Sequence, residues 1–201
     1  MKRTMFFIAA LLLSPVASAK WLTSDSTDKI TGERTVSAFS YIYKQDESIG
    51  IRCDVTSDQR QLMLTFDSDS ALGTPRTDVD IFVKVDDNQP ISFRGRLYTN
   101  SYRSGYVRAD NKIEADVSKL IAQMLAGNKA YVKIQNDRRS EVVNFSVSLT
   151  GFTASSKQTI SACGFNPKAK EITPEDKARL SGIELELKKL QSEKDSILSK
   201  Y

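Results

Sequence analysis

The sequence contains no histidine among its 201 residues. This absence excludes catalytic triads that use an imidazole base, and it excludes zinc sites with histidine ligands. Carboxylate pairs remain as candidates for acid–base or calcium chemistry, and they are Asp67/Asp69, Asp78/Asp80 and Asp86/Asp87. Each pair falls on a solvent-facing strand position or in a turn, and none has the glycine and terminal glutamate of a calcium loop. The sequence therefore predicts a protein that is not an enzyme and that needs no metal or cofactor.

Long apolar runs are also lacking. No run reaches the roughly twenty residues that a membrane-spanning helix needs. The apolar residues 5–13 follow Lys2 and Arg3 and precede Ala17, Ser18 and Ala19. A positive start, a short apolar run and a small-x-small site form the pattern of a secretory signal peptide. We therefore expect residues 1–19 to be removed, no integral membrane segment to remain, and the protein to be located in a bacterial periplasm.

Cysteine is scarce, with Cys53 and Cys163 the two present. In an exported chain such a pair predicts a structural disulfide, which stabilises a fold by roughly 4–5 kcal/mol when the loop is about 110 residues long. The alternative is a pair of reactive or metal-binding thiols, although the CxxC spacing typical of such sites is missing.

The excess of basic over acidic residues is small. The chain has 29 basic and 25 acidic residues, and removal of Lys2 and Arg3 leaves 27 against 25, a net charge of +2. This balance gives no support for a nucleic-acid partner or for binding to an anionic membrane.

Alternating apolar and polar residues predict antiparallel strands through much of the chain. The clearest strand has Val143, Phe145, Val147 and Leu149 on one face, and Gly151 interrupts it at a bulge or a close backbone approach. The other predicted strands cover residues 35–43, 49–55, 62–66, 79–85, 93–98 and 132–134. Residues 20–34 are polar and turn-rich, and we expect Trp21 to pin them to the core.

Two helices interrupt this pattern. Residues 113–126 carry apolar side chains at helical spacing and end at Gly127 or Asn128. A second helix begins at Pro174 and runs to about residue 199, with a three-four spacing of Leu180, Ile183, Leu187, Leu190, Lys194, Ile197 and Tyr201. The predicted fold is mainly β, an antiparallel β-sandwich or flattened barrel over residues 20–166 with one short helix. A linker and the long C-terminal amphipathic helix occupy residues 167–201.

Two surfaces are candidates for protein binding. The first is a basic and aromatic segment that comprises Arg94, Arg96, Tyr98, Tyr102, Arg103, Tyr106 and Arg108. The alternative for this segment is a solvated strand face whose arginines pair with Asp78, Asp80 or Asp86. The second is the apolar stripe of the terminal helix, formed by Leu180, Ile183, Leu187, Leu190 and Ile197. This stripe would dock another exported protein or form a coiled-coil homo-oligomer, or it would pack on its own domain.

Several short segments together resemble the VasI/TagO-like family of type VI secretion-associated periplasmic proteins. The segments are Trp21, Ile51-Arg52-Cys53, residues 79–87, residues 120–125 followed by 131–134, residues 145–151, and Ala162-Cys163-Gly164. The resemblance covers about Trp21 to Gly164 and implies a secreted, disulfide-closed, β-rich accessory domain without catalytic residues. The helix after Pro167 departs from the shorter pattern of the family.

These observations predict a non-enzymatic periplasmic accessory protein that engages another envelope protein, in the type VI secretion context that the resemblance implies. A second hypothesis is a periplasmic inhibitor of a cell-wall hydrolase, similar to a lysozyme inhibitor. In that case the polar loop at residues 67–75 would enter the active-site cleft of the enzyme.

Overall fold

The computed structural model describes residues 20–42, 46–110, 112–166 and 174–200. The predicted signal peptide at residues 1–19, the linker at 167–173 and Tyr201 lie outside the described residues. The chain divides into two compact units, one that ends at Pro167 and one that comprises Lys168–Tyr201. No helix of the described part is long and apolar enough to span a bilayer.

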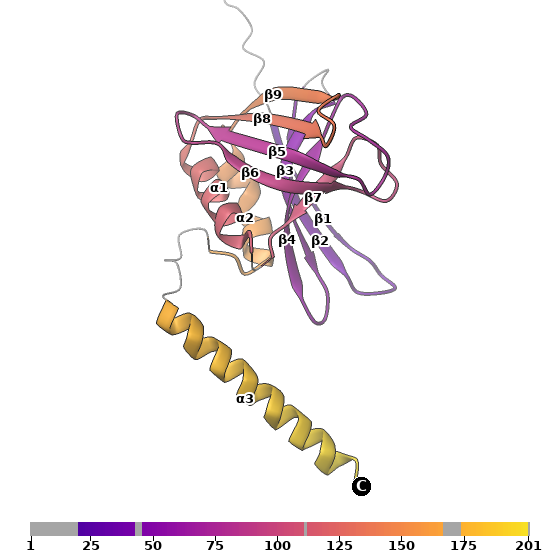
Figure 1. Ribbon diagram of the computed structural model, residues 1–201, viewed down its shortest axis with the longest axis vertical. Coiled ribbons are helices and arrows are strands. Elements are labelled where there is room, and N and C mark those ends of the chain that lie inside the picture. The colour runs from indigo at the N-terminus through magenta and orange to yellow at the C-terminus, as the bar shows by residue number, and fades with distance from the viewer. Residues whose placement is uncertain (1–19, 43–45, 111, 167–173, 201) are drawn as a thin grey trace, which may run out of the picture. The chain divides into compact units, whose positions relative to one another are not determined.

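The first unit is built on a nine-stranded antiparallel sheet (Figure 1). Its strands are β1 (Lys20–Thr27), β2 (Arg34–Tyr41), β3 (Ser48–Val55), β4 (Arg60–Asp67), β5 (Asp78–Val85), β6 (Ile91–Leu97), β7 (Gly105–Arg108), β8 (Lys129–Asn136) and β9 (Val142–Ser148). Their order across the sheet is β1-β2-β3-β4-β7-β6-β5-β8-β9. Most neighbours are hairpins in sequence, but β7 lies between β4 and β6 and joins the two halves of the sheet.

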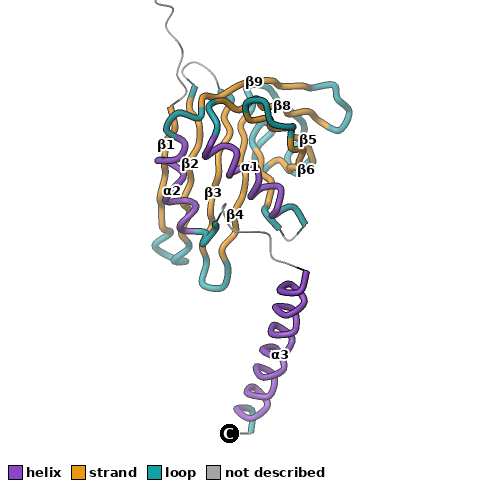
Figure 2. The backbone as a smooth tube through the Cα atoms, turned by 90° about the vertical axis from the view of Figure 1, so that its left-hand side faces the viewer, coloured by secondary structure: helices purple, strands orange, loops and turns teal. Residues whose placement is uncertain are grey.

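Alternation along the strands gives the sheet one apolar face and one polar face. In β5, for example, Val79, Ile81 and Val83 are fully buried whereas Asp78 and Asp80 are partly exposed. Helices α1 (Glu114–Ala126) and α2 (Phe152–Ala162) follow in the chain. Figure 2 shows both helices on the same side of the sheet, and their buried residues join the apolar core there. We call the helix-covered side the inner face and the opposite side the outer face.

The mainly antiparallel β fold with a short helix and a long terminal helix is confirmed, but the strands form one open sheet and not two packed sheets or a closed barrel. The sheet curls so that its edge strands approach each other without pairing. At the approach the Trp21 indole Nε1 of β1 donates a hydrogen bond of 2.8 Å to the backbone oxygen of Ser148 in β9. The role of Trp21 as a core anchor is thereby confirmed. The two helices cover the apolar face that a second sheet would otherwise cover.

Three elements depart from the sequence-based prediction, and one of them is the four-residue strand β7, which was not predicted as a strand. Strand β1 was predicted as a turn-rich segment because its residues after Leu22 are exposed polar side chains, and it is ordered by pairing with β2 along its whole length. Helix α2 was not predicted, since its buried side chains include the hydroxyls of Ser156 and Thr159 and form no apolar stripe. Gly151 lies at the N-cap of α2 with φ 91°, so the glycine break begins a helix and is not a bulge within a strand.

The predicted disulfide between Cys53 and Cys163 is confirmed. Cys53 lies on the inner face of β3 and is fully buried, and Cys163 is the C-cap residue of α2. The bond therefore fastens the end of α2 to a central strand of the sheet.

The second unit contains helix α3 (Pro174–Leu198). Glu175 and Asp176 lie in its first turn, where carboxylates interact favourably with the helix dipole. The sequence correctly predicts this helix and its beginning at Pro174.

Candidate binding surface

The outer face of the sheet carries a groove of about 510 Å³ over β3, β4, β6 and β7, which we call the arginine groove. Its lining combines charged, aromatic and apolar side chains. The residues are Glu33, Arg34, Thr35, Arg52, Asp54, Val55, Thr56, Gln59, Gln61, Met63, Arg76, Arg96, Leu97, Tyr98, Thr99, Tyr106 and Arg108. Strand register brings them together, because Met63 pairs with Arg52 on one side and with Arg108 on the other. Met63 is buried, so it contributes an apolar floor between two guanidinium groups.

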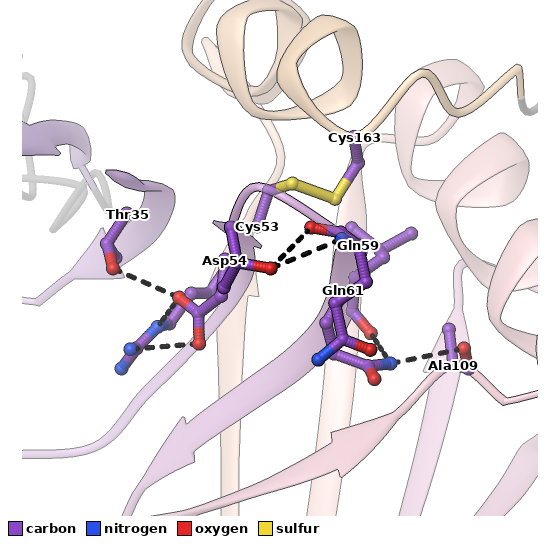
Figure 3. The surroundings of a disulfide bond; sticks show 10 residues. Thr35, Cys53, Asp54, Gln59, Gln61, Ala109 and Cys163 are labelled. Carbon is purple, nitrogen blue, oxygen red and sulfur yellow. Dashed lines mark hydrogen bonds and ion pairs between the residues drawn. A yellow bond between two sulfur atoms is a disulfide. The ribbon is translucent and has the colours of Figure 1, made fainter. Parts of the chain in front are cut away.

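One wall of the groove is an ordered cluster on β3 (Figure 3). The Arg52 guanidinium donates from Nε and Nη2 to the two carboxylate oxygens of Asp54, at 2.7 and 3.1 Å. Thr35 on β2 donates its hydroxyl to the same carboxylate at 3.0 Å. Cys53 lies between Arg52 and Asp54 in the sequence. Figure 3 shows that its side chain turns to the other face of the strand and bonds Cys163. The disulfide thus anchors the strand that carries the cluster.

The other wall of the groove is aromatic. The rings of Tyr98 and Tyr106 lie 5.1 Å apart between centroids, and the Arg108 guanidinium lies 5.4 Å from the Tyr106 centroid. Burial raises the pKa of the Tyr98 phenol above its ordinary value of 10.0, and the nearby Arg52 opposes this rise. This wall therefore combines the neutral phenol of Tyr98 with the Arg108 cation over the Tyr106 ring.

The balance of charge in the groove is positive, because five lining residues are arginines and two are carboxylates. Arg34 pairs with Asp25 at 2.7 Å and Arg52 pairs with Asp54. Arg76 and Arg108 have no carboxylate within ion-pair distance among the described residues. These two guanidinium groups are the cations of the groove that remain available to an anionic ligand.

The predicted basic segment is divided by the structure. Arg96, Tyr98, Tyr106 and Arg108 line the groove, whereas Arg94 does not. Arg94 instead forms ion pairs with Asp80 at 2.7 Å and with Asp137.

Arg96 lines the groove and is also paired. Its Nε donates to Asp78 at 2.7 Å, and this hydrogen bond lowers the pKa of the Asp78 carboxyl. The alternative of arginines paired with Asp78 and Asp80 thus describes Arg94 and Arg96 correctly. It is wrong for Asp86, whose carboxylate accepts from the backbone amides of Asn128 and Lys129.

Two other predicted residues lie in the loop between β6 and β7 and not in the groove. Tyr102 is exposed there, and Arg103 donates to the backbone oxygen of Asp69 at 3.3 Å. The same interaction helps to hold the loop at residues 67–75 against the domain. Leu72 in that loop is fully buried, and its amide donates to the Tyr102 oxygen at 2.8 Å. These contacts hold the loop to the domain at Leu72, while Asp69, Ala71 and Thr74 remain exposed.

The remaining predicted residues are on α3, in the second unit. Leu180, Ile183, Leu187, Leu190 and Ile197 are all exposed. Together they form an apolar stripe. In contrast to the arginine groove, this stripe contains no aromatic and no arginine side chain.

Sequence reasoning missed Arg34, Arg52 and Arg76 as groove residues. The alternation of β3 contains a signal for Arg52, since a residue between the inward-facing Ile51 and Cys53 must face outward. No local pattern marks Arg76, which lies in a loop with φ 69° and reaches the groove through the tertiary fold.

Tyr98 provides a pH test of the groove geometry. Its raised pKa means that the folded protein keeps the phenol protonated after the unfolded chain has lost the proton, so folding stability falls as pH rises above about 10. Relative to Tyr98→Phe, the wild-type free energy of unfolding is expected to decrease between about pH 9 and about pH 11. Urea unfolding of both proteins at both pH values measures this difference. All other titrating groups are common to the two proteins, so their contributions cancel in the comparison. A constant difference would contradict burial of the phenol.

Among the described residues, no group of three or more acidic or cysteine side chains is arranged to hold a metal ion. Comparison with known proteins finds no match to any family model, any curated protein or any solved structure.

Proposed function

We propose that this chain is an exported, non-enzymatic binding protein of the bacterial periplasm that holds an acidic segment of another envelope protein in the arginine groove. The observation that carries the proposal is the presence of two guanidinium groups, Arg76 and Arg108, that have no carboxylate partner in the described part of the chain and that lie in a groove with an aromatic wall and an apolar floor. Arginine and tyrosine are among the residues most enriched where protein interfaces gain their affinity.

The chemistry of the groove fits a carboxylate-bearing peptide. A guanidinium fork binds a carboxylate through two parallel hydrogen bonds, which are stronger than bonds between neutral groups. Tyr98 and Tyr106 offer flat, half-buried surface for the apolar part of such a peptide. The paired cluster of Arg52 and Asp54 keeps the neighbouring wall fixed, so that binding orders few side chains.

The resemblance of several short segments to the VasI/TagO-like family suggests a finer proposal, that the partner belongs to an envelope assembly of the type VI secretion kind. The hydrolase-inhibitor hypothesis, which depends on the loop at residues 67–75, stays a prediction.

Binding of a fluorescent glutamate-rich peptide, followed by anisotropy at low salt, tests the proposal. The variant Arg76→Glu/Arg108→Glu is expected to bind about 100-fold more weakly, since it removes two charge-assisted contacts worth together ~3 kcal/mol. The matched control is Arg138→Glu/Arg139→Glu in the β8–β9 turn. It makes the same change in net charge and also alters one position with positive φ, because Arg139 has φ 53° and Arg76 has φ 69°.

The control variant is expected to keep wild-type affinity apart from a small, salt-sensitive loss. Equal losses in the two variants would show that bulk charge and not the groove attracts the peptide, and would overturn the proposal.

A further inference from the structure

Helix α3 carries an apolar stripe that repeats at intervals of three and four residues. Its members Leu180, Ile183, Leu187, Leu190 and Ile197 have exposed fractions between 46% and 60%. In heptad notation Leu180 and Leu187 occupy a positions, and Ile183, Leu190 and Ile197 occupy d positions. A stripe of this kind keeps its apolar area in contact with water unless another helix covers it.

We propose that α3 pairs with α3 of a second copy of this chain as a parallel two-stranded coiled coil. The inference does not depend on the arginine groove, because it rests on the side chains of the helix alone. The reason for a second copy as the occupant is that the charges beside the stripe complement themselves in one orientation and repel in the other.

The parallel orientation places the g position of one helix beside the following e position of its neighbour. Arg179 at g then faces Glu184 of the second copy at e, and by symmetry this ion pair forms twice. Glu186 faces the neutral Gln191, so no like-charged pair arises at these positions.

The antiparallel orientation pairs g positions with each other. In the register with the greatest overlap, Glu186 faces Glu193 of the second copy, and Arg179 faces Lys200. Each of these like-charged contacts occurs twice. Four repulsive contacts therefore oppose the antiparallel pair, whereas the parallel pair has two attractive ones.

Leucine at a with isoleucine at d, as in Leu180 and Ile183, by itself favours three or four strands, and Lys194 is the residue that opposes this preference. It occupies the a position between Leu187 and Ile197, and a lysine at a single a position specifies the oligomeric state at a cost in stability. In a two-stranded coil its methylene chain covers the seam while its ammonium reaches water beside Glu193 of the second copy. In a four-stranded coil the ammonium would be enclosed in the core, where an unpaired charge is strongly unfavourable.

The mass of the purified full chain, measured by sedimentation over a range of concentrations, tests the pairing. We expect the mass of two copies for the wild type and of one copy for Leu187→Asp, with at least a 30-fold increase in the dissociation constant. Leu185→Asp is the matched control, because Leu185 is 76% exposed and lies off the stripe, so this variant should remain paired. A monomeric wild type, or equal dissociation of the two variants, would overturn the proposal.

A charge exchange tests the orientation. In the parallel pair, Arg179→Glu and Glu184→Arg should each weaken association about tenfold, and the double variant should regain most of the affinity. Within the same helix, Glu175 lies four residues before position 179 and Lys188 four residues after position 184. Both spacings bring like charges together in the double variant, so recovery reports the contact between helices. In the antiparallel pair, Arg179→Glu would instead strengthen association by facing Lys200, which would overturn the parallel assignment.

Discussion

Replacement of Cys53 and Cys163 by alanine is expected to lower the free energy of unfolding by about 4–5 kcal/mol. The bond joins residues separated by 110 positions, and the loss of such a long closed loop restores much conformational freedom to the unfolded chain. Both cysteines are replaced so that no single thiol is left behind. Alanine is used because its small apolar side chain fits the fully buried position of Cys53. Urea unfolding followed by the fluorescence of Trp21, the single tryptophan, measures the change.

The reduced wild type is the control for this variant. Treatment with a thiol reductant should bring the wild type to the same unfolding midpoint as the double alanine variant, because both lack the same constraint. An unchanged midpoint in the variant would mean that the fold of β3 and α2 is fixed by packing alone, with no contribution from the covalent link.

Phe152→Ala is expected to cost about 3–5 kcal/mol, the second large effect. Phe152 is fully buried at the start of α2, and its ring lies edge-on to Trp21 with 4.6 Å between centroids. The truncation removes apolar contacts and leaves a cavity where α2 meets the edge strand β1. The emission of Trp21 in the folded state should also shift to longer wavelength.

Phe82→Ala is the matched control for the cavity. Phe82 lies on the outer face of β5, where it is half-buried beneath the Lys133 ammonium at 5.8 Å from its centroid. The same atoms are deleted there, but solvent can fill the space, so the expected loss is about 1 kcal/mol. Comparable losses at the two positions would indicate that α2 packs loosely on the sheet.

Much of the fold could be predicted from the sequence wherever the apolar residues of a single helix or strand repeat at a regular spacing. Strands such as β5 alternate cleanly, and α1 shows an apolar stripe with Val117 and Leu120 on one side. Helix α2 could not be recognised, since serine and threonine have moderate helix propensity and its burial comes from the sheet beneath it. The single curled sheet was equally hidden, because the position of β7 between β4 and β6 is a long-range pairing without a local pattern.

The binding surface was predictable only in part for the same reason. Arg96, Tyr98, Tyr106 and Arg108 are close in the sequence and were found together. Arg52 comes from a strand more distant along the chain and meets them through the register with Met63. Ion pairs between side chains also depend on tertiary contacts. Arg94 was predicted with these residues, but it pairs with Asp80 and Asp137 and does not line the groove.

The approach of the two edge strands has a consequence for the order of folding. The Trp21 indole meets Ser148, a residue 127 positions later, so the first strand gains its core contact after nearly the whole domain has been synthesised. A topology dominated by such distant contacts folds slowly compared with a helical bundle. During that interval the apolar face of the early strands has no cover, and we expect a nascent chain that ends before α2 to require a chaperone to stay out of aggregates.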